Sequence, residues 1–228
     1  MKKLTTKFQN MKKTTKSNLI TYAIVIVAYI VMSLLSSLGL LSSLMQGLLV
    51  PLCTYAIMAV SLNLTVGILG ELSLGHAGFM CIGAFASAFF TKCTADVITW
   101  TPIRFVIAIV IGALAAAICG FLVGIPVLRL KGDYLAIVTL AFGEIIKNVI
   151  NALYIGKDSK GFHFSMESFM ALGMERDGTM IINGPQGITG TSKDSTFTIG
   201  IILLLITFFI VLNLVQSRSG RAIMSIRD

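Results

Sequence analysis

The sequence contains few charged residues. Asp, Glu, Lys and Arg together make up only 12% of its 228 residues, while 56% are hydrophobic and the mean hydropathy is +0.90. Soluble domains usually contain about 25% charged and about 45–50% apolar residues. The shortage of charge excludes an ordinary water-soluble domain and places the chain among integral membrane proteins.

Motifs of hydrolytic and redox chemistry are also missing. The sequence has no phosphate-binding loop of the form Gly-x-x-x-x-Gly-Lys-Ser/Thr, no His-Glu-x-x-His and no Gly-x-Ser-x-Gly. Its four cysteines are widely spaced and lie mostly in apolar runs, which indicates neither a disulfide framework nor a metal site. We therefore expect no catalytic residue, no metal and no cofactor, and a membrane-embedded enzyme has little support.

The basic residues gather at the two ends of the chain. The net charge is +8, and six of the eighteen Lys and Arg residues fall in the first sixteen positions without an acidic residue among them. Three more basic residues lie between positions 218 and 227. Basic residues beside apolar runs are typical of membrane topology signals. We therefore expect no nucleic acid among the partners.

Apolar runs predict the fold. A helix needs about 20 apolar residues to cross a bilayer, and spans are predicted at 19–41, 44–66, 77–91, 103–128, 134–155 and 197–215. The first run exceeds the 7–15 residues usual for a signal peptide, which favours an uncleaved signal anchor. The predicted fold is an all-α, polytopic transmembrane bundle of about six spans with one extracellular loop or cap.

The distribution of Lys and Arg favours cytoplasmic N- and C-termini. Eleven basic residues fall in the predicted cytoplasmic segments, and the six outside lie mostly in one long loop, where they count less. We predict a basic cytoplasmic tail at 1–18, a transmembrane domain at 19–217 with an extracellular loop at 156–196, and a cytoplasmic segment at 218–228. Because long structureless loops are unusual, the alternative for 156–196 is a small ordered cap with a short helix near 165–172.

A glycine-rich stretch at 61–78 is the first candidate functional segment. Irregular backbone at membrane depth is tolerated only where it is buried in protein or lines a water-filled cavity, and broken helices line substrate pathways in transporters. The alternative interpretation is a cytoplasmic turn between two helices, with His76 as an ordinary hydrogen-bonding residue. The candidate pathway residues here are Asn63, Gly67, Gly70, Glu71, Ser73, Gly75 and His76.

The fifth predicted span supplies a second set of candidates, Thr139, Gly143 and Glu144. Glu144 is about eleven residues into the span and hence near mid-membrane. Ionisable groups at that depth usually face the bundle interior or a water-filled path. The alternative is a Glu144–Lys147 pair that neutralises itself and fixes the rotation of the helix.

Small residues recur every fourth position in the fourth predicted span. Such rows allow helix backbones to approach closely in membranes. We therefore predict a helix-packing face at Gly112, Ala116, Gly120 and Gly124.

Several of these segments resemble a known family. The run at 61–78 resembles the permease subunits of bacterial branched-chain amino-acid ABC importers. The blocks Leu-Lys-Gly-Asp-Tyr-Leu-Ala-Ile-Val-Thr-Leu-Ala-Phe-Gly-Glu at 130–144 and Asn-Gly-Pro-Gln-Gly-Ile at 183–188 resemble the second of that family's two paralogous permeases, the LivM type. Residues 218–228 look like the start of the family's cytoplasmic coupling loop, with Gly220, Arg221 and Ala222 as ATPase-coupling residues.

The resemblance implies a multi-pass permease subunit in a bacterial inner membrane. The implied partners are a paralogous permease, two ATPase subunits that bind the ATP, and an extracellular or periplasmic protein that delivers leucine, isoleucine or valine. Related amide and urea importers share much of the pattern and remain an alternative. Because the family's coupling loop and membrane helices continue further, we expect a C-terminally truncated permease.

The resemblance also suggests a mechanism. The stretch 63–78 and the face 139–144 would line a cavity that alternates in access, and Phe79 and Phe142 would accept the apolar side chain of the substrate. The alternative from another class is an autonomous ion-coupled carrier or channel in which Glu144 is a proton site.

Overall fold

The computed structural model describes residues 13–95, 97–127, 129–130, 132–158, 161–168, 170–173, 178–191 and 194–227. Most of the predicted basic tail, residues 1–12, and Asp228 at the end of the predicted coupling segment therefore lie outside the described residues. The chain forms two compact units, one from residues 1–70 and 195–228 and the other from residues 71–194.

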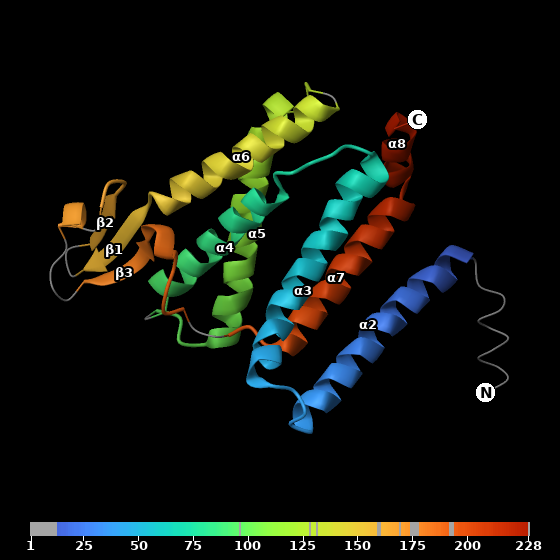
Figure 1. The fold of residues 1–228 in the computed structure, drawn as a ribbon, viewed down its shortest axis with the longest axis horizontal. Helices are drawn as coiled ribbons and strands as arrows, with labels where there is room; N and C mark the ends of the chain where they lie inside the picture. Colours follow the sequence, from blue (N-terminus) through green and yellow to red (C-terminus); the bar gives the residue numbers. More distant parts are fainter. Residues whose placement is uncertain are drawn as a thin grey trace. The chain divides into compact units, whose positions relative to one another are not determined.

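The first unit is built from helices (Figure 1). They are α2 (Lys13–Ser37), α3 (Ser43–Asn63), the π-helical turn η1 (Leu64–Leu69), α7 (Phe197–Gln216) and α8 (Arg218–Arg227). Both α2 and α3 pack against α7, and α8 packs against η1. Serine and threonine cap two of the helices: the side chains of Ser42 and Thr196 accept hydrogen bonds from the backbone amides of α3 and α7.

The core of this unit joins segments that are distant in the sequence. Cys53, Ile201 and Leu204 are buried together. The Tyr29 hydroxyl lies 3.1 Å from the Thr198 hydroxyl, which ties α2 to α7. The contact between α3 and α7 depends on a small residue at Gly200, since an added Cβ there would lie 2.9 Å from the Cβ of Cys53.

The second unit combines three helices with a small sheet (Figure 1). The helices are α4 (His76–Cys93), α5 (Thr101–Val127) and α6 (Asp133–Asn151), and the strands are β1 (Tyr154–Asp158), β2 (Gly161–Ser165) and β3 (Thr179–Asn183). The sheet is antiparallel with the order β2-β1-β3, and two short 3₁₀ turns, η2 (Met170–Leu172) and η3 (Gly184–Gln186), accompany it. The Lys92 ammonium donates to the Met180 carbonyl at 2.8 Å and ties β3 to the end of α4.

The helices of the second unit pack through small residues and one apolar cluster. An added Cβ at Gly112 would lie 2.6 Å from the carbonyl oxygen of Gly83, so α4 and α5 are in backbone contact there. Ala116 lies beside Gly83 as well, and a Cβ added to Gly120 would make an ordinary 3.8 Å contact with Phe79 of α4, whereas Gly124 has open space around it. The predicted packing row therefore meets α4 at its first three positions and not at Gly124.

Phe79 and Phe142, the predicted acceptors of a substrate side chain, are partly buried beside an apolar cluster. Both pack against the buried residues Val123, Val127 and Leu135. Their rings therefore take part in the packing of the second unit, and the suggested contact with a substrate side chain stays a prediction.

The predicted all-α, polytopic membrane fold is confirmed, and each predicted apolar run is largely helical. Within the described part of the chain, four helical stretches are long and apolar enough to cross a membrane: Asn18–Ser37, Ser43–Leu69, Thr101–Val127 and Phe197–Gln216. In each of the four stretches, at most 17% of the most apolar segment is buried within the chain. Most of the surface of these helices is therefore available to lipid. The helices α4 and α6 are shorter, 18 and 19 residues, so the number of six crossings stays a prediction.

The long polar stretch at 156–196 is not a structureless loop. It contributes most of β1 and all of β2 and β3, so the ordered cap is the better description. The short helix expected near 165–172 is only the 3₁₀ turn Met170–Leu172, and residue 169 lies outside the described residues. The strands escape sequence analysis because each is five residues long and two of them contain glycine, which is depleted in strands.

Candidate functional site

The helix that begins as α3 does not continue directly into α4. Its last turn widens into η1, and Gly70 follows with φ of +80°. That left-handed conformation favours glycine, and the Gly70 amide donates to the Thr65 carbonyl to close the turn. The side-chain oxygen of Asn63 fills the space beside Gly67. Single π-helical turns of this kind frequently occur at functional sites.

Residues 71–75 form an irregular segment that packs on α6. The Leu74 amide donates to the Thr139 hydroxyl at 3.1 Å, and that hydroxyl donates to the Ala136 carbonyl at 3.0 Å. Thr139 is buried, its bond to Ala136 is buried, and the bond from Leu74 is partly buried. The segment therefore meets the condition under which non-helical backbone is tolerated at membrane depth.

Close approach of backbones explains the glycines at the start of α4. A Cβ added to Gly75 would lie 2.6 Å from the carbonyl oxygen of Thr139, and one added to Gly78 would lie 3.1 Å from the Cα of Gly143. Contacts shorter than about 3 Å require the backbone to move. Three predicted pathway residues, Gly75, Thr139 and Gly143, therefore meet at one helix contact.

A groove of about 290 Å³ runs between α4 and α6 beside this contact. Its walls are mainly apolar, with one charged pair, and its lining residues are Leu74, Ala77, Gly78, Cys81, Leu140, Gly143, Glu144 and Lys147. The Glu144 carboxylate lies 3.3 Å from the Lys147 ammonium. The groove thus combines apolar surface with both signs of charge, which suits a small zwitterion with an apolar side chain.

Glu144 does not face the interior of this chain. Its side chain is 56% exposed and that of Lys147 is 61% exposed. The Glu144–Lys147 ion pair of the alternative interpretation is present, but it lines the groove and is not buried between helices. An exposed pair of this kind contributes little to stability, about 0–1 kcal/mol.

The remaining predicted pathway residues are divided between the two units. Glu71, Ser73 and His76 are half-buried in the second unit. Asn63, Gly67 and Gly70 belong to the first unit, around η1. The structure therefore brings together only part of the predicted set.

The predicted coupling residues lie in α8. Gly220 is buried, its amide donates to the Ser217 hydroxyl at 3.1 Å, and an added Cβ would collide with the carbonyl oxygens of Leu214 and Val215. Arg221 and Ala222 are exposed. Glycine is thus needed where α7 turns into α8, and the next two side chains are accessible.

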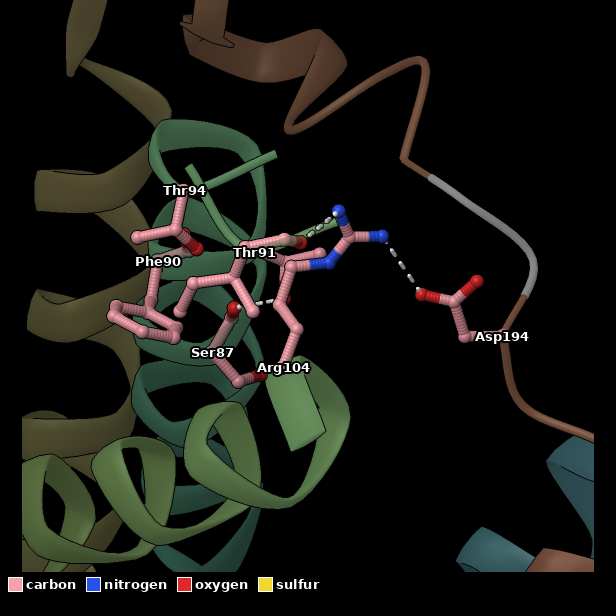
Figure 2. Close-up of polar contacts among 7 residues, drawn as sticks. Ser87, Phe90, Thr91, Thr94, Arg104 and Asp194 are labelled. Atoms are coloured by element: carbon pink, nitrogen blue, oxygen red, sulfur yellow. Dashed lines mark hydrogen bonds and ion pairs between the residues drawn. The ribbon is translucent and has the colours of Figure 1, made fainter. Parts of the chain in front are cut away.

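Arg104 is a polar centre that sequence analysis missed. It lies in the first turn of α5, its side chain is only 10% exposed, and its Nη2 lies 3.5 Å from Oδ2 of Asp194 (Figure 2). Its other terminal nitrogen donates to the Ile98 carbonyl at 3.5 Å. The only sign of it in the sequence is an arginine just inside an apolar run, which by itself indicates membrane topology and no polar site.

The neighbouring turns of α4 are held by threonine hydroxyls (Figure 2). Thr91 donates to the Ser87 carbonyl at 2.8 Å and Thr94 to the Phe90 carbonyl at 2.7 Å. The Phe90 carbonyl also accepts the Thr94 backbone amide at 3.0 Å, so the Thr94 hydroxyl is a second donor to it at the end of the helix.

Comparison with known proteins adds independent information. Residues 44–228 match the family described as the branched-chain amino acid transport system permease component. The chain is 46% identical over 93 residues to the high-affinity branched-chain amino acid transport system permease protein LivM of Escherichia coli (strain K12), a match that covers 41% of this chain and 20% of the relative.

A second relative is matched over more of the chain. The LivM protein of Salmonella typhimurium is 30% identical over 183 residues, which cover 76% of this chain and 41% of the relative. The chain therefore spans less than half the length of either relative. No solved structure matches the chain significantly.

Proposed function

The chain belongs to the branched-chain amino acid permease family, whose model spans residues 44–228, and from this premise we propose that it is a permease subunit of an ABC importer for leucine, isoleucine and valine. It forms the translocation pathway together with a paralogous permease in a bacterial inner membrane, with its N-terminus in the cytoplasm. Separate ATPase subunits bind and hydrolyse the ATP, and an extracellular or periplasmic protein delivers the amino acid. The two relatives, both named as permeases of such a system, support this proposal.

The contact of α4 with α6 is the observation that carries the proposal. Irregular backbone at Leu74 and Gly75 is held on Thr139 beside an open groove of about 290 Å³. The start of a helix presents free amides and the positive end of its dipole, which suit a carboxylate. The apolar wall suits an aliphatic side chain, and no covalent chemistry is needed.

Coupling to ATP hydrolysis is assigned to α8. Gly220 fixes the turn between α7 and α8, and the exposed Arg221 and Ala222 contact the ATPase. Because α8 packs on η1, a displacement of α8 is passed to the turn that precedes Gly70. This connection lies entirely within the first unit.

Uptake by cells tests the function. Deleting the gene for the protein that contains this chain should lower uptake of labelled leucine, isoleucine and valine, while proline uptake stays unchanged. In wild-type cells, the part of this uptake that the deletion removes should also be abolished by ATP depletion at constant membrane potential. Uptake that instead follows the proton gradient would support the ion-coupled carrier, and selective loss of urea or short-amide uptake would support the related importers.

Replacing Glu144 with glutamine tests the groove. Uptake should fall about tenfold if the carboxylate makes one charge-assisted hydrogen bond to the substrate. The free energy of unfolding should change by less than about 1 kcal/mol, because the Glu144–Lys147 pair is exposed. Initial uptake rates across a range of pH provide the measurement, and Lys16→Gln is the matched control for a charge outside the groove. Wild-type uptake at every pH would remove Glu144 from the pathway.

A further inference from the structure

A second cavity, of about 600 Å³, lies within the second unit. Its walls come from the end of α4, the first turn of α5, the strands β1 and β3, and the segment at 190–191. The volume is within the range of about 300–1,000 Å³ that is usual for small-molecule sites. None of the predicted pathway residues lines it, so it is separate from the groove between α4 and α6.

The charged side chains that line this cavity are all cationic, while Asp194, outside the lining, pairs with Arg104. Lys92, Arg104 and Lys157 line it, and no carboxylate is found among the described residues of the lining. Hydroxyl groups supply the other polar side-chain atoms, from Thr91, Thr179 and Thr191. Cationic groups gathered in a concave wall focus a positive potential and concentrate anions. The lining therefore favours an anionic ligand.

Arg104 is the best positioned of the three cations for a ligand. Its side chain is nine-tenths buried, and its fixed guanidinium fork matches a carboxylate. Its contact with Asp194 (Figure 2) and its hydrogen bond to the Ile98 carbonyl are each 3.5 Å long. A tight charge-assisted bond is about 2.7–2.9 Å long, so a carboxylate that approaches more closely than Asp194 gains interaction energy.

The two lysines surround the same space from other elements. Lys92 donates one hydrogen bond, to the Met180 carbonyl at 2.8 Å. Because an ammonium group has three N–H donors, Lys92 can also donate to a ligand. Lys157 enters from β1. Apolar surface completes the wall at Ala95 and Ile181. An inorganic anion would leave that apolar surface unused, whereas an organic acid with a short aliphatic body would cover it.

We propose that this cavity binds a small organic carboxylate, held by Arg104 and Lys157 with its aliphatic part against Ile181. The argument rests on the cavity alone and does not require the transport function. Direct binding to the purified protein therefore tests it independently of uptake.

Calorimetric titration with isocaproate and with its uncharged amide provides the test. Isocaproate should bind, and isocaproamide should bind at least about tenfold more weakly, because it lacks the charge that makes such hydrogen bonds strong. Arg104→Gln and Lys157→Gln should each weaken isocaproate binding about tenfold or more. Arg129→Gln, the same change at an exposed position beyond the opposite end of α5, is the control and should bind as the wild type does.

Asp194→Asn tests the site by an expected increase in isocaproate affinity, which a misfolded protein would not show. Removing the carboxylate that competes for Arg104 should tighten isocaproate binding severalfold. If Arg104→Gln or Asp194→Asn fails to fold by circular dichroism, the half-buried Lys157 provides the deciding variant. Equal affinity for the acid and the amide would overturn the proposal. So would unchanged binding in folded Lys157→Gln protein, or inorganic phosphate that displaces isocaproate with higher affinity.

Discussion

Gly112→Leu is expected to force α4 and α5 apart and to destabilise the protein by about 3 kcal/mol or more. Overpacking a well-filled contact typically costs about 1–3 kcal/mol and occasionally more. Here the new Cβ would lie 2.6 Å from the carbonyl oxygen of Gly83 and 3.2 Å from the Cβ of Ser87. The first neighbour is backbone, so it cannot move aside as a flexible side chain does.

Thermal unfolding in detergent micelles, followed by circular dichroism, measures the effect. Gly124→Leu is the matched control, because it makes the same change in the same helix where an added Cβ meets nothing within 4 Å. The Gly112 variant should unfold at a clearly lower temperature than both the wild type and the control. Equal midpoints for the two leucine variants would show that the α4–α5 contact is looser than the structure has it.

Gly75→Ala is expected to have the largest effect on transport. Its Cβ would lie 2.6 Å from the Thr139 carbonyl oxygen, so the start of α4 must move away from α6. That shift would stretch the Leu74–Thr139 hydrogen bond of 3.1 Å and reshape the groove. We expect a loss of about 1–3 kcal/mol in stability from the packing term and uptake lowered about tenfold or more.

Two companion variants separate packing from hydrogen bonding. Thr139→Val removes the acceptor of the partly buried Leu74 amide at nearly constant volume, and the loss of such a hydrogen bond costs about 1 kcal/mol. Thr139→Ser keeps the hydroxyl and should restore most uptake, measured as initial rates at equal amounts of protein in the membrane. Gly124→Ala, at an open position, should leave uptake at the wild-type level. Normal uptake in the Gly75→Ala protein would refute the assigned role of the α4–α6 contact.

Sequence analysis recovers the helices because their signal is local. An apolar run of about 20 residues specifies a membrane helix without reference to the rest of the chain. The end of the first helix shows the limit of this signal. The apolar run continues to residue 41, whereas α2 ends at Ser37, and Gly39 adopts φ of +69° just beyond it.

The candidate site is less predictable because its contacts are distant in the sequence. The sequence shows that positions 75 and 143 are glycine. Whether Gly75 faces Thr139 depends on how α4 packs against α6, which the sequence does not show. The outward direction of Glu144 depends on the same packing. Arg104 was missed because its partner, Asp194, follows the sheet and is 90 positions away. Such pairs have no periodicity that a single sequence displays.

The interleaving of the two units in the chain has a consequence for the order of assembly during synthesis. The second unit is one continuous segment, residues 71–194, so all its helices and strands have been made before α7 emerges from the ribosome. The first unit is completed only by α7, which supplies the partner surface for α2 and α3. The helices α2 and α3 are therefore in the bilayer without α7 as their packing partner until the whole second unit has been synthesised. The arrival of α7 then supplies the surface against which both helices pack.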